Sequence, residues 1–277
     1  MSYLRFQQFI EDGQYRRYKS VSEVTKLLKN SIRDDLINED INRVVWKECG
    51  VVGKLRTINR YEYNHLDMNE YLFDLGVLPM VSSVKEICLK EEEKRYLCEL
   101  SKTKQNEMVH FYPARLISLG SNSDFKLEPL MNDVSTIQKV YHWNQYMELK
   151  ETLEKNWEDL LFSLRGWLKR QETSRIKSKY GTVALKSMKL YCPKDVLELY
   201  GKDVLLKSSR VNFEKLKEYA AKGFFEMSEV KRFRKVINVE QHFLLMKLEK
   251  EENCKNWFNQ RSNKLSELSR ERCFELF

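Results

Sequence analysis

The sequence predicts a mainly α-helical protein, a bundle of long helices with a small β element near residues 50–60. Two observations lead to this fold class. Nine glycines and four prolines among 277 residues leave few places for turns, whereas a multi-stranded β architecture needs a turn signal roughly every 8–12 residues. Hydrophobic residues make up 42% of the chain and aromatic residues 12%, which is enough to bury a core despite the high charge.

Apolar residues at helical spacing predict most elements before residue 110. Ser20 and Glu23 form a capping box that opens the first helix, and a break is expected near Asn38. The β-branched, glycine-punctuated run 50–58 predicts a turn followed by a short strand. The helices expected in this part cover residues 20–48, 66–75 and 83–102.

A longer helix is expected from Ser135 past Arg170, because apolar side chains recur every three or four residues there without a proline. The stretch 110–129 contains two prolines, Gly120 and a polar run, which is typical of a connection between domains. We therefore expect a mostly helical domain over 1–128 and a long-helix domain over 129–277. The remaining helices are expected over residues 193–200, 212–222, 228–237 and 239–268.

The positive charge of the chain is concentrated in Arg165–Lys194, which we call the basic segment. It holds nine Lys and Arg residues against one acid, Glu172, so removing it from the totals of 49 and 41 leaves 40 of each. Such a localised field attracts polyanions, above all phosphate backbones. Trp167, Tyr180 and Tyr191 lie between the cations, and cations with stacking rings are what single-stranded nucleic acids bind. The predicted nucleic-acid-binding residues are Arg165, Lys169, Arg170, Arg175, Lys177, Lys179, Lys186 and Lys189.

A second basic cluster follows a predicted helix and Gly223. Helix, glycine turn and basic helix together outline a helix-turn-helix, although an ordinary corner between two helices fits the spacing better. The cations of the expected second helix are Lys231, Arg232, Arg234 and Lys235.

Two shorter motifs point to other nucleic-acid chemistry. Gly50 and Gly53 form a GxxG, which resembles the backbone-clamping loop of KH modules. Arg60 and His65 have the Arg-x4-His spacing that resembles the ribonuclease motif of HEPN domains, which are helical. That resemblance implies that the pair would act on a ribose phosphate.

No pattern in the chain predicts a metal site, a cofactor or a catalytic residue outside that pair. The four histidines have no His or Cys three or four residues away, and the six cysteines form no CxxC pair. Dispersed cysteines and an N-terminus without an apolar leader predict free thiols and a cytoplasmic protein. The longest apolar runs are far shorter than the roughly 20 residues that cross a bilayer, so we expect no membrane span.

The favoured function is non-enzymatic binding of nucleic acid, DNA or RNA, through the basic segment, with an acidic protein as the alternative partner. A second interpretation is a protein-binding subunit or inhibitor, of a kind that mobile elements also encode, which docks or self-associates through long aromatic-striped helices. Its anchors would be Trp143, Trp157, Trp167 and Trp257. A third is a helical, HEPN-like ribonuclease that uses Arg60 and His65.

Overall fold

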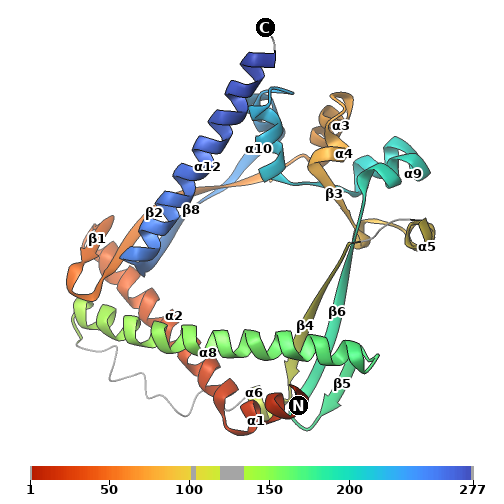
Figure 1. The fold of residues 1–277 in the computed structure, drawn as a ribbon. Coiled ribbons are helices and arrows are strands. Elements are labelled where there is room, and N and C mark those ends of the chain that lie inside the picture. Colours follow the sequence, from red (N-terminus) through yellow and green to blue (C-terminus); the bar gives the residue numbers. More distant parts are fainter. Residues whose placement is uncertain (1, 101–103, 119–133, 276–277) are drawn as a thin grey trace. The chain divides into compact units, whose positions relative to one another are not determined.

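The computed structural model describes residues 2–100, 104–118 and 134–275. It is an α+β fold, because 25% of it is strand beside 63% helix, so the prediction of a mainly α, all-helical bundle is wrong. One antiparallel sheet has the strand order β1-β2-β8, and the other has the order β4-β6-β3-β7 with β5 paired to β6 (Figure 1). The strands are β1 (Arg43–Trp46), β2 (Val51–Tyr63), β3 (Ser82–Lys85), β4 (Lys104–Pro113), β5 (Arg175–Ser178), β6 (Gly181–Tyr191), β7 (Ser209–Val211) and β8 (Arg234–Lys247).

Helices range from single turns to α8, whose 35 residues extend about 50 Å at ~1.5 Å per residue. Those of eight residues or more are α1 (Ser2–Glu11), α2 (Gln14–Asn38), α3 (His65–Asp74), α5 (Glu91–Leu100), α8 (Thr136–Arg170), α9 (Pro193–Ser208), α10 (Phe213–Ala221) and α12 (Leu248–Glu275). The shorter ones are η1 (Lys47–Cys49), α4 (Leu78–Val81), η2 (Glu86–Cys88), α6 (Arg115–Ser118), α11 (Met227–Val230) and η4 (Lys231–Phe233).

The chain divides into two compact units, each assembled from three separate segments. Unit 1 contains 1–56, 107–186 and 241–251, and unit 2 contains 57–106, 187–240 and 252–277. Four strands, β2, β4, β6 and β8, therefore have residues in both units. The predicted boundary after residue 128 falls outside the described residues, and each unit takes residues from both sides of it.

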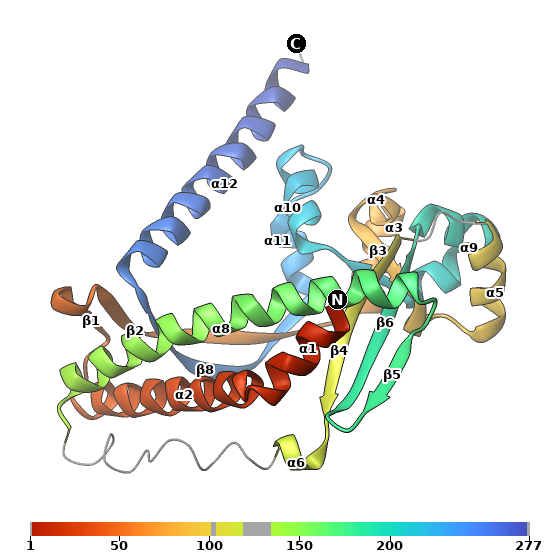
Figure 2. The same ribbon diagram turned by 60° about the horizontal axis from the view of Figure 1, so that its bottom comes forward.

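Unit 1 is organised by α8, which packs along α2 (Figure 2). Ser135 and Gln138 form a capping box that starts α8, so the backbone N–H groups of these two residues are satisfied. Val140 and Trp143 of α8 are buried with apolar residues of α2, β2 and β8. The α2 residues of this core recur every four positions: Val24, Leu28, Ile32 and Leu36.

The C-terminal half of α8 packs against α1 and one face of the sheet that β4, β6 and β5 form. Leu164 and Leu168 are fully buried there beside Phe6. From the sheet, Val183 of β6 is buried in the same core, and Ile176 of β5 packs on it. This core fixes which face of the three strands is covered.

Unit 2 has its own apolar core, built by α3, α4, β3, α9 and α10. Asn69 is buried in it and donates hydrogen bonds from Nδ2 to the carbonyl oxygens of Leu206 (2.7 Å) and Ser209 (3.3 Å). The amide therefore satisfies buried backbone acceptors where α9 passes into β7.

The expected helices 66–75, 193–200 and 212–222 correspond to α3, α9 and α10, and the helix from Ser135 corresponds to α8. The turn and strand expected over 50–58 are also present, as the turn at Gly50 and the longer β2. Four other expectations are wrong. The first long helix, α2, begins at Gln14 and not at Ser20, which is buried within it. In the other three, strands replace helix: β1 follows α2 after Asn38, β3 opens the stretch 83–102, and β8 takes most of 228–247.

Within the described ranges, every helix is too short or too polar to cross a membrane.

Candidate nucleic-acid interface

The basic segment does not continue as helix after Arg170. It leaves α8, forms the β5–β6 hairpin and ends at the start of α9. Lys186 and Lys189 both belong to the strand β6. The hairpin pairs Arg175 with Ala184 and Lys177 with Thr182.

The two faces of this hairpin differ in chemistry. Residues opposite each other in an antiparallel pair point to the same face, and side chains alternate along each strand. Arg175 and Lys177 therefore share a face, and Lys186, two residues after Ala184, joins them. All three side chains are exposed. The opposite face carries Ile176 and Val183, which pack into the core under α8.

The neighbouring strand β4 adds two rings to the exposed face. Lys186 Nζ lies 5.4 Å from the ring centroid of Tyr112, which places that ring on the same face as the cations. His110, two residues earlier, is also exposed, and its ring stacks on Tyr112 at 6.3 Å. We call this surface the outer face, made of Met108, His110, Tyr112, Arg175, Lys177, Thr182, Ala184 and Lys186.

The outer face contains no carboxylate among its described residues, so its three cations are not neutralised within it. Adjacent strands lie about 4.8 Å apart, and alternate residues along a strand are separated by roughly 6.8 Å. Arg175, Lys177 and Lys186 thus surround a patch on the order of 10 Å across, with Tyr112 at one side. Figure 2 shows β5, β6 and β4 side by side.

Two predicted cations, Arg165 and Lys169, lie on the covered side instead. Both extend from α8 to the carboxylate of Glu107 on β4, Arg165 at 3.5 Å and Lys169 at closer range. The Glu107 side chain is only 14% exposed, since it lies on the same face of β4 as Val109 and Phe111, which pack on the core. The hydrogen bond from Lys169 lowers the pKa of Glu107 below its ordinary value. These cations attach α8 to the sheet.

We expect Glu107→Gln to lower stability at pH 7, because Arg165 and Lys169 lose their counter-charge. Since the pKa of Glu107 is lowered in the folded protein, its carboxylate stabilises the fold above its ordinary pKa of 4.5, and this is lost as pH falls through the lowered value. Urea unfolding midpoints of both proteins at pH 7 and pH 3 check this. The gap between them should shrink at pH 3, and an unchanged gap would contradict the ion pair.

The other predicted cations of the segment are dispersed. Lys179 lies in the hairpin turn, 3.6 Å from Glu11 and 4.8 Å from the Tyr180 ring centroid. Arg170 is exposed at the end of α8, whereas Lys189 is half-buried and has an interaction partner within the fold. The hairpin thus brings together three of the eight predicted residues, Arg175, Lys177 and Lys186.

The rings predicted to stack on bases pack against other parts of the protein instead. Trp167 stacks on Tyr3 at 5.1 Å, while Tyr180 and Tyr191 are 8% and 2% exposed. The accessible rings are those of His110 and Tyr112, which were not predicted from the sequence. Their signal is a two-residue period in which Val109 and Phe111 face the core, but the prolines nearby favoured a linker interpretation.

No family model, curated protein or solved structure matches this chain.

The second basic cluster is not a helix, so the helix-turn-helix outline is wrong. After α10 the chain makes only the four-residue α11 and the 3-10 turn η4 before β8 begins. Lys231 and Arg232 lie in η4, and Arg234 and Lys235 open β8. A single turn cannot serve as the recognition helix that enters a groove.

The GxxG has a packing explanation. Gly50 adopts φ +61 in the turn before β2, and Gly53 is buried, where an added Cβ would lie 2.9 Å from the Trp46 ring. A loop that clamps a nucleic-acid backbone has to be accessible, whereas Gly53 is covered by Trp46 and Phe243. The glycine is needed for this close approach.

The Arg60–His65 pair lies in unit 2, on β2 and at the start of α3. Arg60 forms an ion pair with Glu240 at 2.8 Å, and His65 is exposed beside Tyr63 at 6.1 Å. The helical context of the HEPN resemblance is absent here because Arg60 is in a strand, and cleavage of RNA stays a prediction. In the described part of the chain, no group of three or more potential metal ligands comes together.

The tryptophans of the docking interpretation are mostly internal. Trp143 is 4% exposed, and Trp157 and Trp167 pack on the core beneath α8. Trp257 on α12 is 58% exposed beside the equally accessible Phe258. Docking onto a protein partner therefore stays a prediction with one of its four anchors on the surface.

Proposed function

We propose that this chain is a non-enzymatic, cytoplasmic protein that binds single-stranded nucleic acid across the outer face. The observation that carries the proposal is the convergence of Arg175, Lys177 and Lys186 with the rings of His110 and Tyr112 on one carboxylate-free surface. The cations neutralise phosphates, and an exposed ring offers a surface on which a base stacks. Neither interaction requires a particular base, so binding is expected to tolerate many sequences.

A single strand suits this surface better than a duplex does. Duplex bases are stacked inside the helix and expose only their edges, which are read by a helix or a narrow β-ribbon. Bases of a single strand are free to turn outward onto Tyr112 and His110. An acidic protein would meet the same cations but has no bases for these rings, so nucleic acid accounts for more of the surface.

The charge distribution supports the same proposal at longer range. The basic segment carries a net charge of +8, and the rest of the chain is formally neutral. Cations of the segment that are not on the outer face, such as Arg170, still add to the local field, which falls off over about 10 Å at 0.1 M salt. The approach of a strand is therefore guided to this part of the protein.

We expect the protein to bind labelled single-stranded DNA or RNA more tightly than a duplex of the same length, with affinity that falls as salt rises. Three phosphate contacts predict a slope of about −2 for log affinity against log salt with single strands. Fluorescence anisotropy at about 50 to 200 mM salt measures both quantities. Stronger binding of the duplex would indicate that the hairpin enters a groove of the duplex instead. Absence of binding at the lowest salt concentration would refute the proposal.

A further inference from the structure

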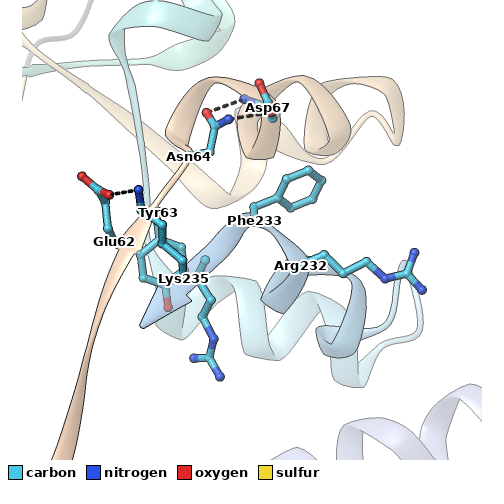
Figure 3. Close-up of a pocket in the computed structure, with 8 residues that line it drawn as sticks. Glu62, Tyr63, Asn64, Asp67, Arg232, Phe233 and Lys235 are labelled. Atoms are coloured by element: carbon cyan, nitrogen blue, oxygen red, sulfur yellow. Dashed lines mark hydrogen bonds and ion pairs between the residues drawn. The ribbon is translucent and has the colours of Figure 1, made fainter. Parts of the chain in front are cut away.

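A cavity of about 510 Å³ lies in unit 2, where the end of β2 and the start of α3 meet the junction of η4 and β8 (Figure 3). Its volume is within the ~300–1,000 Å³ of small-molecule sites. The backbone N–H of Asn64 donates a hydrogen bond to the carbonyl oxygen of Phe233 at 2.8 Å. That bond holds the two walls together, so the cavity is built by the fold.

The acidic side chains of the cavity are already engaged. Glu62 forms an ion pair with Lys235 at 2.8 Å. Their hydrogen bond lowers the pKa of Glu62 and raises that of Lys235. Asp67 accepts a hydrogen bond from Asn64 Nδ2 at 2.5 Å. Figure 3 shows both interactions among the residues that line the pocket.

The two guanidinium groups of the cavity, on Arg232 and Arg234, form no ion pair with any carboxylate in the described ranges. Arg234 lies over the ring of Tyr61, with Cζ 3.9 Å from the centroid, and this contact orients its guanidinium group. Arg232 is exposed on η4. The lining contains three cations, Arg232, Arg234 and Lys235, and two anions, Glu62 and Asp67. It therefore has an excess of one positive charge.

Aromatic side chains form the apolar part of the lining. Tyr63 and Phe233 come from the two walls and are held from behind, Tyr63 by Phe213 at 4.9 Å and Phe233 by Tyr71 at 5.5 Å between ring centroids. Rings that are fixed in this way provide a surface for a flat aromatic group at little entropic cost.

We propose that this cavity binds a nucleoside monophosphate group, with the phosphate on Arg232 and Arg234 and the base against Tyr63 and Phe233. Arginine forks match the oxygens of a phosphate and bind it in bidentate fashion. The group has two sources, a free nucleotide or the phosphorylated end of a strand. The site is separate from the outer face, since every residue that lines it belongs to unit 2.

Isothermal titration of the full chain with AMP tests the site. Arg232→Gln and Arg234→Gln are each expected to weaken AMP binding about 10–100-fold, the usual loss for one charged hydrogen-bond partner. Lys231→Gln is the matched control, because Lys231 lies in the same 3-10 turn but does not line the cavity, and it should bind AMP like the wild type. Arg234→Lys keeps the positive charge. Comparing it with Arg234→Gln shows whether a loss of AMP binding at this position comes from a loss of folding.

Further ligands identify the source of the phosphate. Adenosine and inorganic phosphate should each bind more weakly than AMP. A 5′-phosphorylated strand that binds better than its 5′-hydroxyl form, only when Arg232 is present, assigns the site to strand ends, and AMP binding without that gain assigns it to free nucleotides. Equal binding of adenosine and AMP, or AMP binding that neither Gln variant changes, would overturn the proposal. Removal of Arg175, Lys177 and Lys186 should leave AMP binding unchanged, so the two proposals fail separately.

Discussion

Simultaneous replacement of Arg175, Lys177 and Lys186 by Gln is expected to lower affinity for a single strand about 100-fold at about 0.1 M salt. Each phosphate contact of a single strand contributes about 0.7 to the salt slope, so three contacts are worth roughly two decades of affinity between 0.1 M and 1 M salt. The slope itself should move from about −2 toward zero. All three side chains are exposed, so folding should be retained, and anisotropy titrations at several salt concentrations measure the loss.

A control with the same change in net charge separates the outer face from the general field of the protein. Lys26, Lys47 and Lys155 are exposed on α2, η1 and α8 of unit 1. Replacing these three by Gln also removes three charges, and it should weaken binding only slightly. An equal loss in both triple variants would mean that affinity follows net charge, and the outer face would lose its assigned role.

The helices were predictable where one side of the chain is buried over several turns. In α8, apolar residues recur every three or four positions because α2, α1 and a sheet cover the same stripe, and Ser135 supplies a cap that the sequence displays. Burial of one stripe therefore left a periodic signal, and the cap left a signal for the start of the helix.

The exposed parts of strands β2 and β8 left no such signal, although the first half of β2 was predicted as a short strand. Along β2 only the first residues are buried, and positions 56–62 are exposed on both faces. Most of β8 before Phe243 is also exposed. An alternating pattern arises only where one face of a strand is covered, so these exposed stretches carried no pattern that marks a strand. The small number of glycines and prolines then led to the wrong prediction of fold class, because these long strands need few turns.

The basic segment was correctly seen as a concentration of charge, but its division between two faces could not be read from composition. Arg-Ile-Lys-Ser-Lys at 175–179 alternates with period two, which is the mark of a strand. Which cations join Tyr112 depends on the pairing of β6 with β4, a contact between segments about 70 residues apart in sequence. The partner of Arg165 and Lys169, Glu107, depends on the same long-range contact.

Gly181→Ala is expected to destabilise unit 1 by about 2–5 kcal/mol, the sum of a left-handed backbone penalty and an overpacking penalty. Gly181 has φ +134, and an added Cβ would lie 2.2 Å from the carbonyl oxygen of Tyr112 and 2.8 Å from the backbone nitrogen of Ala114. The first is a backbone atom of β4 and the second belongs to the residue that follows this strand, so relief requires the hairpin to move away from β4. Urea unfolding and amide hydrogen exchange of β5 and β6 measure the effect.

The same substitution should also weaken binding of single-stranded nucleic acid, because the outer face exists only while β4, β6 and β5 are joined. Gly13→Ala is the control: Gly13 also has positive φ, +72, but nothing lies within 4 Å of its added Cβ. It should cost only about 1–2 kcal/mol and leave strand binding intact. If the two alanine variants lost equal stability, backbone strain alone would explain both, and the close approach of β6 to β4 would not be what holds Tyr112 beside Lys186.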